Sequence, residues 1–237
     1  MRYLFWGVMS LLLLSCTAAP IGVCPLDGSS EVHRVVKTKT RLEAQTRNAT
    51  IKVMTYKDGA IAMGTGTVYS YKGYNIVITA AHVLGGPPYL TAALSDTDYV
   101  MSSLVYLDTD ADIAVLAIPE LIGVKPMQLR RRRTEVKIGE NTIYAGFPND
   151  DIELTIRGYI SAIRSDGALY LHSYAWPGAS GSSVFDTQGR LLGVLSAIGV
   201  GTGIVGVPTA IEDVVLVVPI TDLNFELLDL NLKSLDY

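Results

Sequence analysis

Short β-branched segments separated by turn residues dominate the chain from residue 50 onward. Residues 50–56 alternate apolar and polar side chains, and further apolar runs follow at residues 60–71 and 74–79. The intervening Lys57-Asp58-Gly59 and Lys72-Gly73 contain the Gly and Asp that are typical of tight turns. Because this stretch has no helical period of apolar residues, the pattern predicts an all-β sandwich or barrel.

One loop stands out among the turns, between residues 176 and 185, where the sequence reads Trp-Pro-Gly-Ala-Ser-Gly-Ser-Ser-Val-Phe. Ser180 lies between Gly178 and Gly181, in a segment that can bend sharply and present one hydroxyl. A serine hydroxyl is a weak nucleophile at neutral pH and needs a nearby imidazole to accept its proton. The loop therefore predicts a nucleophile at Ser180, with Ser182 and Ser183 as rivals closer to the next strand.

A histidine and an aspartate that could serve this serine lie upstream. His82 follows Thr79-Ala80-Ala81 at the end of an apolar strand, and Asp112 begins the next apolar strand. A carboxylate beside an imidazole holds the correct tautomer and stabilises the charged form. Asp108 and Asp110 compete with Asp112, but only Asp112 enters the strand directly. The apolar residues that follow supply no further oxygen ligands, so the sequence predicts no metal site here.

The motifs Thr79-Ala80-Ala81-His82, Asp112-Ile113-Ala114 and Gly178-Ala179-Ser180-Gly181 occur in the order His, Asp, Ser. Together they resemble the trypsin-like (chymotrypsin-fold) serine peptidases. Within that family they are most similar to bacterial and viral members of the HtrA and glutamyl-endopeptidase types. The resemblance covers about residues 48–220.

The resemblance implies both a fold and a reaction. The fold would be all-β, with two six-stranded antiparallel β-barrels at about residues 48–118 and 135–220 and a C-terminal helix at about residues 220–235. The whole of residues 48–237 would form the peptidase domain. The reaction would be hydrolysis of peptide bonds through a Ser-His-Asp triad and an acyl-enzyme, with a polypeptide as substrate and without a metal or organic cofactor.

The resemblance also implies roles for residues around the serine loop. The backbone N–H groups of Gly178 and Ser180 would form the oxyanion hole. The Ser196 hydroxyl would bond to the catalytic aspartate, and Tyr174 would line the pocket for the substrate side chain. An extended substrate would pair with the backbone of a short segment, namely Ser196, Ala197 and Ile198.

The serine loop departs from the family pattern at two places. Ala179 stands where Asp or Asn is usual, and Ser182-Ser183 stand where Gly-Pro is commonest. The alanine argues against activation by a new N-terminal amine and removes a polar group from the loop. It is also the feature that favours the alternative function, a catalytically inactive binding lipoprotein with a protease fold.

The N-terminus carries a basic residue, then an apolar run and small residues, which is typical of a secretory signal. Residues 1–16 resemble a bacterial signal peptide with a lipobox, in which Cys16 would become the lipid-modified first residue and tether an exported protein to the membrane. Ordinary cleavage after Ala19 and retention as an uncleaved anchor remain open. Residues 17–47 are polar with little apolar periodicity, so we expect a linker or N-terminal arm.

The cysteine content and the net charge limit which disulfides and partners can be expected. Cys16 and Cys24 are the only cysteines of the 237 residues, so the predicted peptidase domain has no disulfide, unlike secreted animal members of the family. The formal net charge is −4, and nucleic acid is therefore not an expected partner. The four arginines at residues 130–133 are interpreted as a solvated loop between the barrels.

Overall fold

Eight strands from the first half of the chain pair into one sheet in the computed structural model, which describes residues 37–57, 60–85, 90–93, 99–148, 152–202 and 208–236. The order is β5-β4-β1-β2-β3-β7-β6, and β8 pairs with β2 in parallel. The strands are β1 (Thr50–Lys57), β2 (Ala60–Tyr71), β3 (Tyr74–Thr79), β4 (Leu90–Ala93), β5 (Tyr99–Met101), β6 (Ser103–Asp108), β7 (Ile113–Ile118) and β8 (Met127–Gln128).

This sheet has eight strands where the sequence led us to expect six. One of the additional strands has a clear cause. The pairing of β1 with β2 begins at Thr50 and Thr67, so the end of β2 beyond Thr67 is not covered by β1. The linker strand β8 pairs with that uncovered end, at Tyr69 and Ser70.

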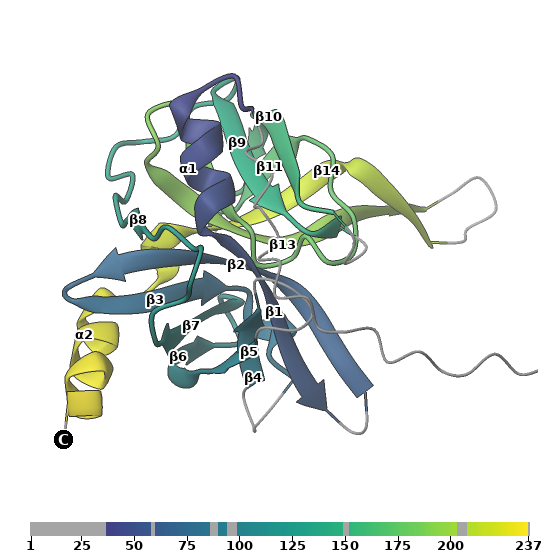
Figure 1. Cartoon of the computed structure of the whole chain (residues 1–237). Coiled ribbons are helices and arrows are strands. Elements are labelled where there is room, and N and C mark those ends of the chain that lie inside the picture. The colour runs from purple at the N-terminus through teal and green to yellow at the C-terminus, as the bar shows by residue number, and fades with distance from the viewer. Residues whose placement is uncertain are drawn as a thin grey trace, which may run out of the picture. The chain divides into compact units, whose positions relative to one another are not determined.

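Six strands from the second half form a closed barrel, as predicted (Figure 1). Their order around the barrel is β10-β11-β14-β13-β12-β9. The strands are β9 (Asn141–Gly146), β10 (Leu154–Ile163), β11 (Leu169–His172), β12 (Ser183–Asp186), β13 (Leu191–Thr202) and β14 (Pro208–Pro219). The fold is therefore mostly β, with a sheet and a barrel that share apolar core. Phe185, Leu191 and Val194 of the barrel belong to the same buried cluster as the first sheet.

A helix that the sequence did not indicate, α1 (Arg41–Ala49), occupies the end of the expected arm at residues 17–47. Thr40 caps it, because its hydroxyl accepts from the Glu43 N–H while the Glu43 carboxylate accepts from the Thr40 N–H. Glu43 also accepts from Arg157 of β10 at 2.7 Å. Polar contacts thus hold this helix against the barrel, which is why apolar periodicity missed it.

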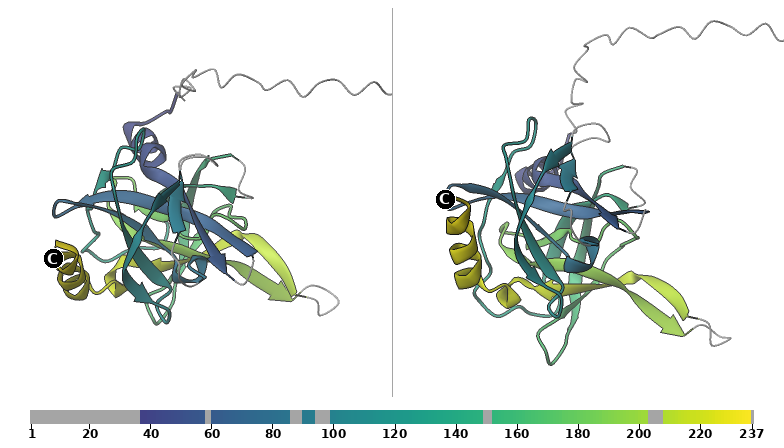
Figure 2. Two further views of the ribbon diagram at one scale, coloured as in Figure 1. Left: turned by 60° about the horizontal axis from the view of Figure 1, so that its bottom comes forward. Right: turned by 90° about the horizontal axis from the view of Figure 1, so that it is seen from below.

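The C-terminal helix α2 (Phe225–Lys233) begins later than the expected residue 220. Ile220–Asp222 form a 3-10 turn after β14, and the Asn224 side chain then caps α2. The helix packs on the first sheet, where Asn231 donates to the Val105 carbonyl at 2.7 Å. The chain therefore returns from the barrel to the first sheet at its end (Figure 2).

The arginine run is only partly solvated, although the sequence led us to expect a solvated loop: Arg130 and Arg133 are exposed, but Arg131 and Arg132 are not. Arg132 is 10% exposed and contacts Glu140 at 2.7 Å and Asp186 at 3.1 Å. The Arg131 guanidinium lies 3.8 Å from the centre of the Phe225 ring. The buried Asp186, the half-buried Glu140 and the face of the Phe225 ring thus draw Arg131 and Arg132 inward. These contacts attach the linker to the rest of the domain.

The signal peptide and lipobox predicted at residues 1–16, including Cys16, lie outside the described residues, as does most of the predicted arm. Among the residues that the structure does describe, no helix has the length and apolar character needed to cross a membrane.

Candidate active site

The predicted histidine lies at the end of β3, where the strand passes into a 3-10 turn, Ala81–Val83. Ala81 and Val83 are buried on either side of it, while the His82 side chain remains 50% exposed. The turn is therefore anchored by its apolar neighbours, and it presents the imidazole at the surface of the first sheet.

Asp112 meets His82 from the turn between β6 and β7. Its carboxylate accepts from His82 Nδ1 at 2.9 Å and from the His82 backbone N–H, also at 2.9 Å. Asp112 has a φ of 52°, in the left-handed region that Asp tolerates better than most residues. Asp108, one of its rivals, instead accepts from the Asp110 and Ala111 backbone N–H groups in a local turn. The structure thus brings Asp112, and neither rival, to the histidine.

The two groups change each other's pKa. The hydrogen bond to Asp112 raises the pKa of His82 above its ordinary value, against an opposing effect of burial. Burial raises the pKa of Asp112, but hydrogen bonds from His82 and Ser196 outweigh it and leave that pKa below its ordinary value. The pair therefore favours a charged carboxylate beside an imidazole that readily accepts a proton.

Backbone hydrogen bonds join the serine loop to both neighbouring sheets. The Ser180 carbonyl accepts from the Thr65 N–H of β2 at 2.8 Å, and the Gly181 N–H donates to the Leu195 carbonyl of β13 at 2.7 Å. Gly181 has a φ of +89°, and a Cβ there would overlap the Thr65 carbonyl. Only glycine fits this position, because the conformation and the close approach of β2 both exclude a side chain.

Gly178 and Ser180 leave their N–H groups without a hydrogen-bond acceptor among the described residues. Gly178 has a φ of +99°, which glycine adopts readily. The intervening Ala179 N–H is used, since it donates to the Trp176 carbonyl at 3.0 Å. The loop therefore offers two unpaired donors close together, at the positions predicted for an oxyanion hole.

The Ser180 hydroxyl donates to the Ser196 carbonyl at 3.3 Å. No hydrogen bond joins Ser180 to His82 in the described part of the chain. Ser196 nevertheless links the two groups, because its own hydroxyl donates to Asp112, as the resemblance implied. Ser182 and Ser183 are fully buried, so Ser180 is the partly accessible serine of the loop.

Ala179, the departure from the family pattern, is buried in the apolar cluster of the barrel. An aspartate at this position would need a partner in apolar surroundings, and alanine needs none. Ser182 supplies polar support instead, because its hydroxyl donates to the Ala179 carbonyl at 2.7 Å. The two departures thus fit each other, and the loop keeps its hydrogen bonds without an acidic side chain.

β13 presents an open edge at the predicted substrate segment. On one side, Ala197 and Ile198 pair with β14. On the other, β12 pairs with β13 only as far as Val194. A register shift between Leu195 and Ala197 marks a bulge at Ser196, the residue whose hydroxyl reaches Asp112. The serine loop still covers Leu195, whose N–H donates to the Ser182 carbonyl at 2.9 Å and whose carbonyl accepts from the Gly181 N–H at 2.7 Å. Among the described residues, no second strand pairs with β13 at Ala197 and Ile198 on that side.

Residues 64–194, more than half of the 237-residue chain, match the model of the trypsin-like peptidase domain. The chain belongs to this family. The matched range includes His82, Asp112 and Ser180, whose roles stay predictions.

Relatives agree with the family, and solved structures agree with the fold. A probable periplasmic serine endoprotease of the DegP-like type from Ectopseudomonas mendocina is 28% identical over 152 residues, covering 59% of this chain and 30% of that protein. The chain thus spans less than a third of that relative. A serine endoprotease from Yersinia pestis superposes with a TM-score of 0.64 at 20% identity, over 82% of this chain and 68% of that one. The active form of the Rv3671c protease from M. tuberculosis superposes with a TM-score of 0.60 at 21% identity. This match covers 77% of this chain and 80% of that one.

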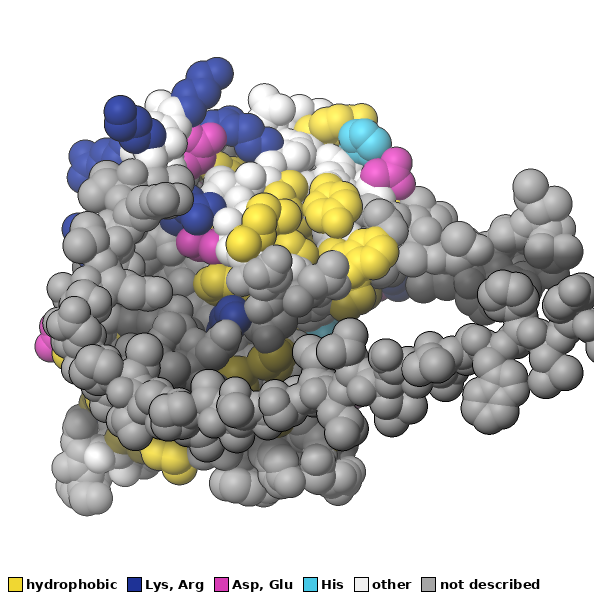
Figure 3. Space-filling view, turned by 45° about the vertical axis from the view of Figure 1, so that its right-hand side comes forward, with side chains coloured by type: hydrophobic (Ala, Val, Ile, Leu, Met, Phe, Trp, Pro, Cys, Tyr) yellow, Lys and Arg dark blue, Asp and Glu magenta, His cyan; other side chains and the backbone are white. Residues whose placement is uncertain are grey.

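Tyr174, the predicted pocket wall of this peptidase domain, is 44% exposed, and its carbonyl accepts from the Tyr144 hydroxyl. Nearby in sequence, His172 packs its ring on Tyr159 with centroids 5.2 Å apart. Figure 3 shows exposed hydrophobic side chains gathered on one face of the molecule beside a histidine and an acidic side chain.

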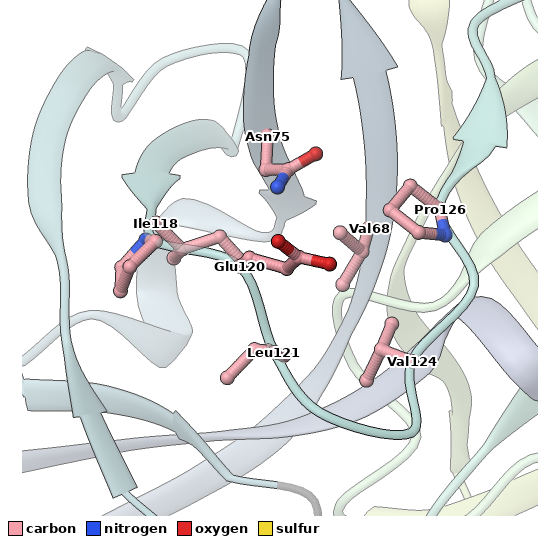
Figure 4. Close-up of a pocket in the computed structure, with 8 residues that line it drawn as sticks. Val68, Asn75, Ile118, Glu120, Leu121, Val124 and Pro126 are labelled. Carbon is pink, nitrogen blue, oxygen red and sulfur yellow. The ribbon is translucent and has the colours of Figure 1, made fainter.

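The peptidase domain has a separate pocket of about 280 Å³, lined by none of these residues (Figure 4). β2, β3 and the end of β7 form it together with residues 119–126. Asn75 and Glu120 provide its polar groups, and it contains neither a histidine nor a serine. Its lining lacks the groups needed for nucleophilic catalysis. In the described part of the chain, no cluster of three or more His, Cys, Asp or Glu side chains is arranged to hold a metal.

One contact of the serine loop was missed from the sequence. Thr65, in the Gly64-Thr65-Gly66 segment of β2, donates its hydroxyl to the Gly178 carbonyl at 2.7 Å. The glycines could be recognised as sites of close strand packing, but nothing local to Thr65 indicates a partner 113 residues away.

Proposed function

We propose that the chain is an exported serine endopeptidase in which Ser180 is the nucleophile, His82 the general base and Asp112 the group that orients the base. The observation that carries the proposal is the convergence on Ser196. Its carbonyl accepts from the Ser180 hydroxyl and its hydroxyl donates to Asp112, which in turn holds His82. Three segments distant in sequence thus contribute a serine hydroxyl, an imidazole and a carboxylate to this set of contacts, which supports the proposed roles.

In the proposed reaction, the Ser180 hydroxyl turns from the Ser196 carbonyl toward His82 and attacks the scissile carbonyl. His82 Nε2 accepts the serine proton, because its Nδ1 is bonded to Asp112. Catalytic hydrogen bonds are often long or misaligned before substrate binds, so the present direction of the hydroxyl is compatible with this step. His82 then gives the proton to the leaving amine, and water hydrolyses the acyl-enzyme by the reverse sequence.

The oxyanion of each tetrahedral intermediate would accept from the Gly178 and Ser180 N–H groups, which have no other acceptor among the described residues. A polypeptide substrate would add as a strand to the open edge of β13 at Ser196, Ala197 and Ile198. Tyr174 would contact the substrate side chain. The natural substrate is thus expected to bind in an extended conformation.

The test is labelling of the full chain with a fluorophosphonate probe, with Ser180→Ala and His82→Ala beside it. We expect labelling of the wild type and none of either variant, because an unactivated serine reacts negligibly with the probe. A folded wild type that takes no label would contradict the proposal and favour the binding lipoprotein without catalysis.

Export and membrane tethering form the second part of the proposal and rest on the signal-like N-terminus. Cys16 would carry the lipid. Expression in a bacterial host with labelled palmitate should give a labelled protein, and Cys16→Ser should not be labelled. A Cys16→Ser protein that retains the lipid label would reject this attachment site, and a wild type without label would favour ordinary cleavage or an uncleaved anchor.

A further inference from the structure

Both polar groups of the peptide between Gly178 and Ala179 form hydrogen bonds. Its carbonyl accepts from the Thr65 hydroxyl at 2.7 Å, and its N–H donates to the Trp176 carbonyl at 3.0 Å. The neighbouring peptide, which carries the Gly178 N–H, has no such contact at its own N–H among the described residues. The direction of that N–H therefore depends on the torsions of Gly178, measured from the fixed peptide.

A change in the backbone conformation of Gly178 would turn its N–H away from its present direction. Its φ of +99° is one of several conformations open to glycine, so the residue itself does not select it. The contact from Thr65 restrains the carbonyl that would move if Gly178 adopted another conformation. A single hydroxyl on the first sheet thus restrains the oxyanion loop of the barrel.

Thr65 is well placed to act as a rigid support. It is fully buried, and its carbonyl accepts from the Thr79 hydroxyl at 2.7 Å. Its N–H donates to the Ser180 carbonyl at 2.8 Å, and its hydroxyl oxygen also accepts from the Phe147 N–H at 3.1 Å. The hydroxyl proton is consequently directed at the Gly178 carbonyl, and every polar group of the residue is used.

We propose that Thr65 is a positioning residue for the oxyanion hole, which it aligns through the hydrogen bond from its hydroxyl to the Gly178 carbonyl. This role rests on the proposed function. Thr65 touches neither His82 nor Asp112 through any of these bonds, so it acts on stabilisation of the oxyanion and leaves proton transfer unchanged. Removal of the Thr65 hydroxyl should slow formation of the covalent bond between Ser180 and a saturating fluorophosphonate. The affinity for the fluorophosphonate and the midpoint of the pH profile should not change.

The experiment measures inactivation of the full chain by a fluorophosphonate, with the maximal rate (kinact) and the half-saturating concentration (KI) determined separately. Thr65→Val keeps the shape and removes the hydroxyl. We expect its kinact to fall about ten- to a hundredfold, less than the hundred- to thousandfold that loss of a whole oxyanion donor costs. KI should change less than about twofold, because ground-state binding does not use the hole. The midpoint of the pH profile should not move.

Two further variants separate positioning from general damage. Thr65→Ser restores the hydroxyl and should recover kinact to within about threefold of the wild type. Thr67→Val is the matched control, since Thr67 is an equally buried threonine of β2. Among the described residues, its hydroxyl meets only the Ser183 N–H, at 3.4 Å. This long contact is weak, so kinact should stay within about threefold. Rates are expressed per folded molecule, and Thr65→Ala replaces the valine variant if that variant does not fold.

The outcomes are distinguishable. A wild type that takes no label overturns the proposed function and this role together. A labelled wild type with an unchanged kinact in the folded Thr65→Val or Thr65→Ala protein overturns the role of Thr65 alone. That role is also overturned if Thr65→Ser fails to recover activity or if Thr67→Val loses as much as Thr65→Val.

Discussion

The serine loop and the His82–Asp112 pair are held in opposite ways. Backbone hydrogen bonds from β2 and β13, together with the Thr65 hydroxyl, fix the loop, and its glycine at residue 181 has no room for a side chain. His82 is half-exposed, and the contacts that orient its ring come from the Asp112 carboxylate. Ser180 is therefore placed mainly by the backbone around it, while the His82 ring is placed mainly by one side chain.

This difference matches what each part would do. The loop must aim two N–H groups at one developing charge, which demands a rigid backbone. The histidine must gain and lose a proton, so access to solvent and a responsive pKa are useful there. Substitutions in the loop should consequently affect folding and activity together, whereas substitutions at the pair should affect activity with less effect on folding.

The largest effect is expected from Asp112→Asn. The amide cannot stabilise the imidazolium, and it favours the wrong tautomer, so kcat should fall by about 10⁴-fold. The free energy of unfolding should change less than it does for a loop substitution, because the pair is partly exposed. Initial rates on a labelled protein substrate and urea unfolding measure the two quantities. An Asp112→Asn protein that keeps the wild-type kcat would contradict the claim that His82 depends on the Asp112 carboxylate.

Gly181→Ala should mainly damage the fold. The left-handed conformation alone costs an alanine about 1–2 kcal/mol, and overlap of its Cβ with the Thr65 carbonyl adds to this. Urea unfolding of the variant and the wild type gives the loss. Gly139→Ala is a matched control, since Gly139 has a φ of +87° but open space around its Cβ position. Equal losses in the two variants would show that the close approach of β2 adds nothing.

The smallest effect is a displacement of the acid limb of the pH profile. His82 must be neutral to accept a proton, and its bond to Asp112 raises its pKa. Activity should therefore be lost as the pH falls through a midpoint above the ordinary histidine value of about 6.5. In Asp112→Asn the residual activity should show a lower midpoint, because the carboxylate no longer stabilises the imidazolium. A wild-type profile that stays flat down to pH 4 would exclude His82 as the base.

Local patterns in the sequence predicted the strands, and the resemblance to the trypsin-like peptidases supplied the barrel and the roles of the candidate site residues. Alternation and turn residues predicted the strands, and the order of three short motifs predicted which His, Asp and Ser would approach one another. Asp112 could be preferred over Asp108 because it directly precedes the apolar run at residues 113–118. Its contact with His82 agrees with that choice, although the catalytic roles remain untested.

The features that were missed depend on contacts between distant segments. Helix α1 is stabilised by its cap and by Arg157, so a search for apolar periodicity passes over it. Arg132 is drawn inward by Glu140 and Asp186, and neither partner is implied by a run of arginines. The importance of Thr65 likewise depends on Gly178, which folding alone brings beside it.

The measurement that tests the central claim most directly is localisation of the fluorophosphonate adduct by tandem mass spectrometry of the labelled full chain. Residues 176–185 contain three serines, of which Ser182 and Ser183 are buried. We predict a single adduct on Ser180. An adduct on Ser182, Ser183 or a serine outside this loop would contradict the account.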